Sequence, residues 1–369
     1  ALFVADSDNH KIRRVEVATG AVTTLAGSGA SGSADGVGGA AEFCWPYGVT
    51  VSPDGSALFV SDLENNKIRR VEVATGAVTT VAGSGSRGSA DGVGGAAQFC
   101  GPHGVVISPD GSALFVTDFG GHKIRRVEVA TGVVTTLAGS GVRGSTDGVG
   151  GAAQFYGPYD VAISPDGSVL FVADMHNHKI RRVEVATGAV TTLGVSGSMG
   201  DADGVGDAAQ FDNPAGIAIS PDSTALFVAD ENNNKIRRVE VATGAVTTLA
   251  GSGDVGDADG VGDAAQFANP AGIAISQDGS ALFVADYSNN AIRRVGVATR
   301  AVTTLADSGT MGDADGVGDA AQFHNPAGTA ISQDGRALFV AGCSNNKIWR
   351  VEVATGAVTT LAGSGEEGD

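Results

Sequence analysis

The chain has 369 residues, including 57 glycines, and 42% of its residues are hydrophobic. A net charge of −18 argues against a nucleic-acid partner, because such binding relies on cationic surface that displaces counterions. The dense apolar runs argue against disorder, and no run of 18 apolar residues predicts a membrane span in this segment. Three cysteines are too few for a disulfide framework, so the sequence leaves the cellular compartment open.

A repeat of 56 residues runs through the whole chain. The hexapeptide ALFVAD and its variants begin at residues 1, 57, 113, 169, 225, 281 and 337. Repetition at a fixed period of this length is typical of solenoids and propellers, in which each unit buries its surface against its neighbours. The fold of one unit therefore predicts the fold of the chain.

One repeat predicts four short strands in chain order. Gly48–Ser52 alternates apolar and small residues, and a Pro-Asp-Gly turn separates it from the continuous apolar run Ala57–Asp62. A polar turn precedes the β-branched and charged segment Lys67–Val73, and an Ala-Thr-Gly turn leads to Ala77–Gly83. Turn signals every 8 to 12 residues favour an antiparallel meander over helices.

A four-stranded sheet of this size cannot bury both of its faces alone. Radial stacking of such sheets covers the faces and leaves only short edges, so we expect an all-β propeller formed by a single domain, residues 1–369. Seven blades with an incomplete first blade are favoured and six blades are the alternative, because the first strand occurs six times and the others seven. The chain begins and ends inside a repeat, which suggests a fragment of a longer protein. The expected blades lie at about 1–29, 44–85, 100–141, 156–197, 212–253, 268–309 and 324–365.

The pattern FxxPxGVxxSPDGxxLFVxDxxNNKIRRV resembles the NHL repeat, and its copies cover essentially the whole chain. The resemblance implies a propeller, usually of six blades, that serves as an interaction platform. A few proteins with a related fold are metal-dependent enzymes, so the resemblance also allows an enzymatic function. RNA binding, known for some NHL domains, needs a basic face that this composition does not provide. The last copy departs from the pattern, with Gly342 in place of Asp and Trp349 in place of Arg.

Long loops between the blades, such as Ser28–Phe43, are expected on the same face as the turns that follow the second strands. Loops of this length are uncommon in compact domains and often functional. Each loop ends in a phenylalanine that we expect to hold the loop between two blades, so the loops are either structural spacers or part of a binding surface. The phenylalanines are Phe43, Phe99, Phe155, Phe211, Phe267 and Phe323.

An aspartate ends the second strand and an arginine recurs in the third. Both are lost together in the last copy, which predicts that the two side chains pair across the strands. The pairs that we expect to be structural are Asp62 with Arg69, Asp118 with Arg125, Asp174 with Arg181, and Asp230 with Arg237. A ring of arginines that binds an anion is the alternative.

The last three loops carry the motif DADGVGD where the first three carry SADGVGG or STDGVGG. Three carboxylates in a glycine-containing loop could coordinate Ca²⁺, although the spacing is not that of an EF-hand. Turn hydrogen bonding and a solvated acidic rim are the alternative, and no other cofactor is expected. The candidate ligands are Asp201, Asp203, Asp207, Asp257, Asp259, Asp263, Asp313, Asp315 and Asp319.

Aromatic residues cluster where the first strands begin. The early copies contain aromatic side chains at these entrances, whereas the later copies have Ala215, Ala271 and Ala327. Tryptophan and tyrosine are favoured at recognition hot spots, so these positions predict a partner-binding arc at the mouth of the channel; packing over the channel is the alternative. The candidates are Trp45, Tyr47, His103, Tyr156 and Tyr159.

The sequence favours a non-catalytic platform that binds a protein or peptide through its long-loop face. The alternatives are a metal-dependent propeller enzyme of lactonase or lyase type and a purely structural segment of a larger surface protein. Histidines offer little support for an enzyme, because His10, His122 and His178 occupy a turn position where other copies have Asn. We expect them to be turn hydrogen-bonders. Oligomeric state and localisation stay open.

Overall fold

The structure is a computed structural model that describes residues 1–194, 196–307 and 309–365. The described residues divide into two compact units. Unit 1 contains Ala1–Asn177 and Arg181–Thr191, and unit 2 contains His178–Ile180 and the chain from Thr192 on. Among the described residues, no helix is both long and apolar enough to cross a membrane.

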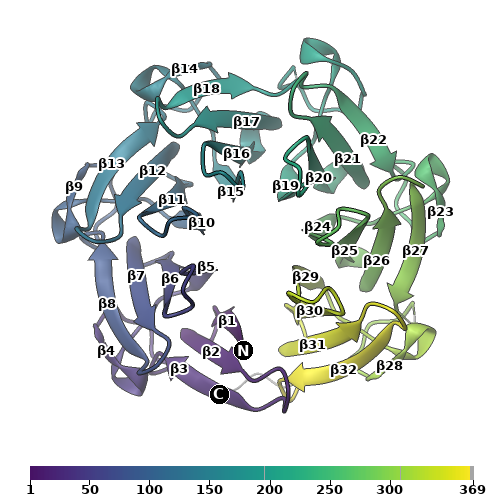
Figure 1. Ribbon diagram of the computed structural model, residues 1–369, viewed down its shortest axis with the longest axis horizontal. Coiled ribbons are helices and arrows are strands. Elements are labelled where there is room, and N and C mark those ends of the chain that lie inside the picture. Colours follow the sequence, from purple (N-terminus) through teal and green to yellow (C-terminus); the bar gives the residue numbers. More distant parts are fainter. Residues whose placement is uncertain (195, 308, 366–369) are drawn as a thin grey trace. The chain divides into compact units, whose positions relative to one another are not determined.

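Seven antiparallel sheets follow one another along the chain, each of them one propeller blade (Figure 1). The seven-blade expectation is confirmed, and the six-blade alternative is wrong. The first sheet consists of β1 (Leu2–Asp6), β2 (Lys11–Val15) and β3 (Val22–Ala26). The second consists of β4 (Gly36–Val37), β5 (Pro46–Val51), β6 (Ala57–Asp62), β7 (Lys67–Glu72) and β8 (Ala77–Ala82). The third consists of β9 (Gly92–Val93), β10 (Pro102–Ile107), β11 (Ala113–Asp118), β12 (Lys123–Glu128) and β13 (Val133–Ala138).

The remaining sheets repeat this order. The fourth consists of β14 (Gly148–Val149), β15 (Pro158–Ile163), β16 (Val169–Asp174), β17 (Lys179–Glu184) and β18 (Ala189–Thr192). The fifth consists of β19 (Pro214–Ile219), β20 (Ala225–Asp230), β21 (Lys235–Glu240) and β22 (Val246–Ala250). The sixth consists of β23 (Gly260–Val261), β24 (Pro270–Ile275), β25 (Ala281–Asp286), β26 (Ala291–Gly296) and β27 (Ala301–Ala306). The seventh consists of β28 (Gly316–Val317), β29 (Pro326–Ile331), β30 (Ala337–Gly342), β31 (Lys347–Glu352) and β32 (Ala357–Ala362).

Short 3-10 helices occur in the loops and in three of the turns. They are η1 (Gly38–Ala40), η2 (Gly94–Ala96), η3 (Gly150–Ala152), η4 (Met175–Asn177), η5 (Gly206–Ala208), η6 (Glu231–Asn233), η7 (Gly262–Ala264), η8 (Tyr287–Asn289) and η9 (Gly318–Ala320).

The strand formed by the continuous apolar run of the repeat, β6 in the second sheet, is buried on both faces, as its composition predicts. Every residue of β6 is buried, and its side chains alternate between two hydrophobic clusters. Ala57 and Phe59 join Leu114 of the next sheet, whereas Leu58 and Val60 join residues of the first sheet. A continuous apolar run is therefore required in β6, because the second sheet has a neighbour on either side.

The blade-to-blade loops are more structured than their glycine content suggests. In the loop before β5, Gly36 and Val37 pair antiparallel with the outer strand β8 and add a fifth strand that we did not predict. Phe43, at the end of the loop, is fully buried between Ile12 of the first sheet and Leu58 of the second. The phenylalanine therefore holds the loop between two blades, as expected.

Candidate functional site

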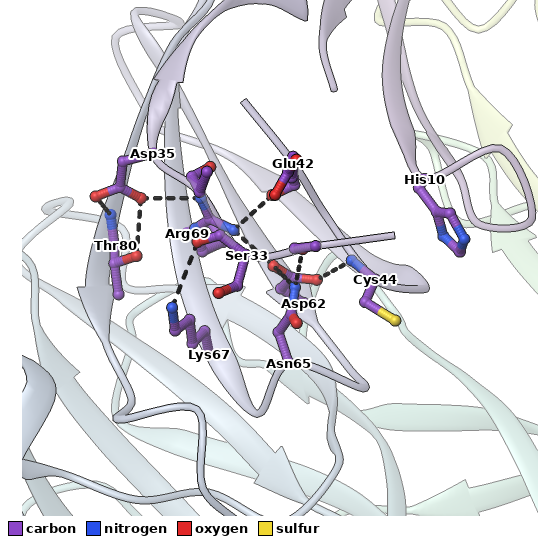
Figure 2. A network of polar contacts seen from close by, with 12 residues as sticks. His10, Ser33, Asp35, Glu42, Cys44, Asp62, Asn65, Lys67, Arg69 and Thr80 are labelled. Atoms are coloured by element: carbon purple, nitrogen blue, oxygen red, sulfur yellow. Dashed lines mark hydrogen bonds and ion pairs between the residues drawn. The ribbon is translucent and has the colours of Figure 1, made fainter. Parts of the chain in front are cut away.

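A buried ion pair between an aspartate and an arginine occurs in each of the second to sixth sheets. In the second sheet, Arg69 Nη1 on β7 lies 2.7 Å from Asp62 Oδ2 at the end of β6, and both side chains are fully buried (Figure 2). Asp62 also accepts hydrogen bonds from the Cys44 amide at 2.7 Å and from Asn65 Nδ2 at 2.8 Å. One carboxylate thus ties the strand, the following turn and the entrance of β5 together.

The other side of the Arg69 guanidinium faces the loop. Its Nη2 donates to the Ala34 carbonyl and lies 2.9 Å from Asp35 Oδ1, and Nη1 donates to the Glu42 carbonyl. The guanidinium also lies 5.1 Å from the ring centroid of Phe43, in a cation–π contact. The two terminal nitrogens of Arg69 are therefore occupied by contacts with Asp62 and with the loop that precedes β5.

The same pair recurs in four further sheets at distances of 2.7 to 3.1 Å. These pairs are Asp118 with Arg125, Asp174 with Arg181, Asp230 with Arg237, and Asp286 with Arg293. Burial raises the pKa of Asp118 to about 6, against the lowering influence of the Cys100 amide and the Arg125 guanidinium. Burying the two charges costs desolvation free energy, so the pair fixes the positions of the strand and the turn more than it stabilises the blade.

The seventh sheet replaces the pair by packing. Trp349 is fully buried at the arginine position, and its ring centroid lies 4.8 Å from that of Phe323. A Cβ at Gly342 would collide with this indole. The joint loss of aspartate and arginine therefore has a steric reason as well as an electrostatic one.

The candidate calcium ligands take several different roles. Asp203 and Asp259 each lie 2.9 Å from a buried arginine, and Asp315 accepts from the Thr360 amide and hydroxyl. Burial works to raise the pKa of Asp203, but hydrogen bonds from Thr248 and the charge of Arg237 lower it overall.

Two further aspartates of these loops pair with lysines. Asp201 lies 2.6 Å from Lys235 Nζ and Asp313 lies 2.8 Å from Lys347 Nζ. The remaining candidates are exposed, and within the part of the chain that the structure describes no three metal-ligating side chains gather. These exposed candidates are Asp207, Asp257, Asp263 and Asp319. Calcium binding stays a prediction.

Three of the five aromatic candidates form one stack in unit 1. The His103 ring lies between Tyr47 and Tyr159, with centroid distances of 3.8 and 4.0 Å, and the two tyrosine hydroxyls are 2.8 Å apart. These residues come from β5, β10 and β15, which pack side by side. Sequence register thus brings three neighbouring entrances into direct contact.

His103 is buried, and its environment fixes its protonation. Its Nδ1 lies 3.1 Å from the Tyr159 carbonyl, which can only accept, so Nδ1 carries the proton. Burial lowers the pKa of His103 to about 4. The stack therefore contains a neutral imidazole at physiological pH.

The stack continues through residues that the sequence analysis did not select. Phe119 contacts Tyr159 and His176 at centroid distances of 6.3 and 5.3 Å, and His176 contacts Tyr156 at 4.8 Å. Phe119 directly follows the buried Asp118, and His176 lies two residues after the buried Asp174, in the equivalent turn of the next sheet. Their place in these turns, which we expected on the same face as the long loops, was the signal that could have identified them.

Trp45 and Tyr47 are the most exposed of the five aromatic candidates. Trp45 is 49% exposed and Tyr47 is 44% exposed, whereas His103 is buried. Trp45 has a left-handed backbone (φ 53°), and its amide donates to His10 Nδ1 at 3.3 Å. The aromatic candidates thus combine a packed interior with two accessible rings.

Comparison with known proteins defines the class. Residues 45–260 match the model of the SMP-30/Gluconolactonase/LRE-like region, and the repeated four-stranded blades are those of a β-propeller. The chain belongs to the NHL-repeat propeller family.

Two curated relatives cover most of this chain. The chain is 31% identical to NHL repeat-containing protein 2 of Homo sapiens over 337 residues, which are 82% of this chain and 46% of that protein. It is 30% identical to Protein SUPPRESSOR OF QUENCHING 1, chloroplastic, of Arabidopsis thaliana over 325 residues, 85% of this chain and 30% of that protein. The chain spans less than half the length of these relatives.

Solved structures share the fold at low identity. A virginiamycin B lyase from Staphylococcus aureus matches with a TM-score of 0.56 and 17% identity, over 85% of this chain and 83% of that chain. An auxiliary nutrient binding protein from Bacteroides thetaiotaomicron VPI-5482 matches with a TM-score of 0.58 and 14% identity, over 86% and 69%. One fold thus serves a lyase and a binding protein, and it does not by itself assign an activity.

Proposed function

We propose that this propeller is a non-catalytic platform that binds a protein or peptide partner at the aromatic stack of unit 1. The observation that carries the proposal is the exposure of Tyr47, which stacks against His103, and of Trp45, two residues before it in the chain. Aromatic side chains held in one rotamer lose little entropy on binding, and they dominate protein interfaces. Aromatic residues are only 5% of the chain, so their concentration here is specific.

The opposite ends of the same strands present ordinary turns. Asp110, in the turn between β10 and β11, accepts hydrogen bonds from Ser108 and Ser112, which lower the pKa of its carboxyl to about 2. Its polar groups are satisfied within the turn. We therefore place the partner at the strand entrances and use the turn as the control surface.

The competing function is enzymatic, of lactonase or lyase type. It is favoured by the match to the SMP-30/Gluconolactonase/LRE-like region and by the lyase fold neighbours. Turnover of a lactone or of a streptogramin B that is lost in His103→Ala and His176→Ala would support this function and replace the platform proposal.

The test begins with a displayed peptide library selected against the purified chain. One selected peptide, labelled with a fluorophore, is then titrated by anisotropy against variants whose fold is checked by circular dichroism. Trp45→Ala and Tyr159→Ala should each weaken binding about 30-fold, the equivalent of about 2 kcal/mol at a hot spot. Asp110→Ala should leave the affinity within twofold.

Two results would overturn the proposal. Loss of affinity in Asp110→Ala, with unchanged affinity in both aromatic variants, would place the partner on the turn surface. Unfolding of both aromatic variants would assign these residues to packing. Tyr159→Phe then shows whether the fold needs the ring stack or the 2.8 Å contact between the Tyr47 and Tyr159 hydroxyls, because it retains the ring and removes only the hydroxyl.

A further inference from the structure

One turn position links each of the first six sheets to the entrance of the next one. The residue there has a left-handed backbone and accepts a hydrogen bond from a main-chain amide 35 residues further along. Asn66 Oδ1 accepts from Gly101 at 2.9 Å, and Asn234 and Asn290 repeat this arrangement in unit 2 at 3.0 and 2.9 Å. This contact is a clamp between successive blades.

Three clamps use histidine in place of asparagine. His122 Nδ1 accepts from the Gly157 amide at 3.3 Å, as His10 Nδ1 does from Trp45 and His178 Nδ1 from Asn213. An imidazole nitrogen accepts a hydrogen bond only while it is unprotonated, whereas an asparagine oxygen accepts at any pH. Only the histidine clamps can therefore respond to acid.

The His122 clamp contacts the aromatic residues through its own ring. Its ring lies 5.6 Å from that of Tyr156, edge to face, and Tyr156 also contacts His176 and the guanidinium of Arg143. Burial lowers the pKa of His122, the charges of Arg143 and His176 lower it further, and the Phe119 carbonyl opposes them. A second positive charge would therefore be unfavourable here.

We propose that His122 is a pH-dependent latch that holds the entrance of β15 while neutral and releases it when protonated. The Gly157 amide sits between Tyr156 and Tyr159, so its release loosens two residues of the aromatic stack. Protonated Nδ1 would point a hydrogen at the hydrogen of Gly157 and place a cation beside Arg143. The consequence for partner binding rests on the proposed function; the latch itself does not.

The His178 clamp has different charged surroundings, because Asp212 Oδ1 lies 3.3 Å from His178 Nδ1. His122 faces Arg143 and His176 instead, so its clamp stays closed at neutral pH and opens in acid. The folded state of His122 binds its proton less readily than the unfolded chain, whose histidine pKa is about 6.5, so the contribution of the latch is complete above that pH and is lost as pH falls.

The latch is tested on the full chain without any partner, by amide hydrogen exchange and ¹⁵N spectra of the histidine rings. We expect the exchange protection of Gly157, corrected for the intrinsic rate, to fall about 10-fold or more between pH 7.5 and 5.0 as His122 titrates. His122→Asn installs the residue found in the other clamps and should change by less than twofold. Arg143→Ser, the residue of the first loop at Ser31, should move the transition to higher pH.

Equal pH dependence in the wild type and His122→Asn would overturn the latch, as would a His122 ring that titrates without a change at Gly157. Binding of the selected peptide supplies a separate readout: a 10-fold loss in acid that His122→Asn abolishes extends the latch to the binding site. If the library yields no peptide that binds while Gly157 still opens in acid, the proposed function fails and the latch stands.

Discussion

The strand entrances of unit 1 and unit 2 have the same backbone role and different surfaces. Tyr47, His103 and Tyr159 begin strands in unit 1, whereas Ala215, Ala271 and Ala327 occupy the matching positions in unit 2. All six residues lie directly after the proline that begins their strand, in β5, β10, β15, β19, β24 and β29. Because alanine suffices for the blade in unit 2, the fold alone does not account for the aromatic side chains of unit 1.

The two regions also differ in charge. Residues 1–191 contain 18 acidic and 14 basic residues, whereas residues 192–369 contain 23 acidic and 9 basic residues. Most of the surplus negative charge comes from the DADGVGD loops and their surroundings. One region has thus gained aromatic contacts and the other has gained carboxylates on a common scaffold.

The largest expected loss of stability tests whether the two units share the same buried ion-pair core. Arg125→Met in unit 1 and Arg237→Met in unit 2 each leave a buried aspartate without its ion pair, which should cost about 3 to 5 kcal/mol of unfolding free energy. Urea denaturation measures both. A cost below about 1 kcal/mol in only one unit would show that the regions differ in their cores as well as on their surfaces.

The seventh sheet supplies the control for that experiment. The double variant Asp118→Gly with Arg125→Trp copies the seventh sheet into the third. The protein should lose much less unfolding free energy in this variant than in Arg125→Trp alone, because no buried carboxylate remains and space opens for the indole. A double variant as unstable as the single variant would mean that Trp349 depends on its own surroundings.

A smaller effect separates the regions by acid sensitivity. The neutral form of His103 is favoured in the folded state, with a pKa of about 4 against about 6.5 in the unfolded chain, so its contribution is present above pH 6.5 and is lost as pH falls towards 4. The loss should reach about 3 kcal/mol across that range. His103→Ala, which copies unit 2, should flatten the profile of stability against pH.

That measurement is best made in the His122→Asn background, so that the latch does not contribute. If His103→Ala retains the full acid dependence, the buried imidazole is not its source.

The sequence predicted the scaffold well because the repeat supplies the same physical constraint seven times. Continuous apolar strands, Pro-Asp-Gly turns and the Asp–Arg register each follow from local pattern. The short strand Gly36–Val37 was missed, since two residues carry no periodicity. Pairing of Arg69 with Asp35 was missed because the contact joins residues 34 positions apart in a loop without a strand pattern.

The aromatic region was only partly predictable. Register placed Tyr47, His103 and Tyr159 at equivalent entrances, but the ring contacts depend on side-chain rotamers that no spacing encodes. The role of His122 as an acceptor required the position of Gly157, a backbone amide that any sequence would have. These side chains are recognised as a site by their distances from one another in the structure, and residue type alone would not have identified them.

The smallest expected effect concerns the acidic loops of unit 2. Asp207, Asp263 and Asp319 are exposed, and glycine occupies the matching positions in the first three loops. Replacing all three by glycine should raise the unfolding free energy by less than about 0.5 kcal/mol at low salt, because like charges then repel less. The gain should vanish in 0.5 M NaCl, where the Debye length falls to about 4 Å.

The same variant distinguishes a solvated acidic rim from a calcium site. On a solvated rim, Ca²⁺ should raise the melting temperature no more than Mg²⁺ at matched ionic strength, and the wild type and variant should respond alike. A bound Ca²⁺ would stabilise only the folded wild type, with an increase that grows with the logarithm of the ion concentration. Asp203 and Asp259 are unsuitable for this test because each pairs with a buried arginine, and their removal would destabilise the blade whether or not calcium binds. A calcium-specific increase that the triple glycine variant abolishes would therefore make the acidic loops, and not the aromatic stack alone, a functional difference between the two regions.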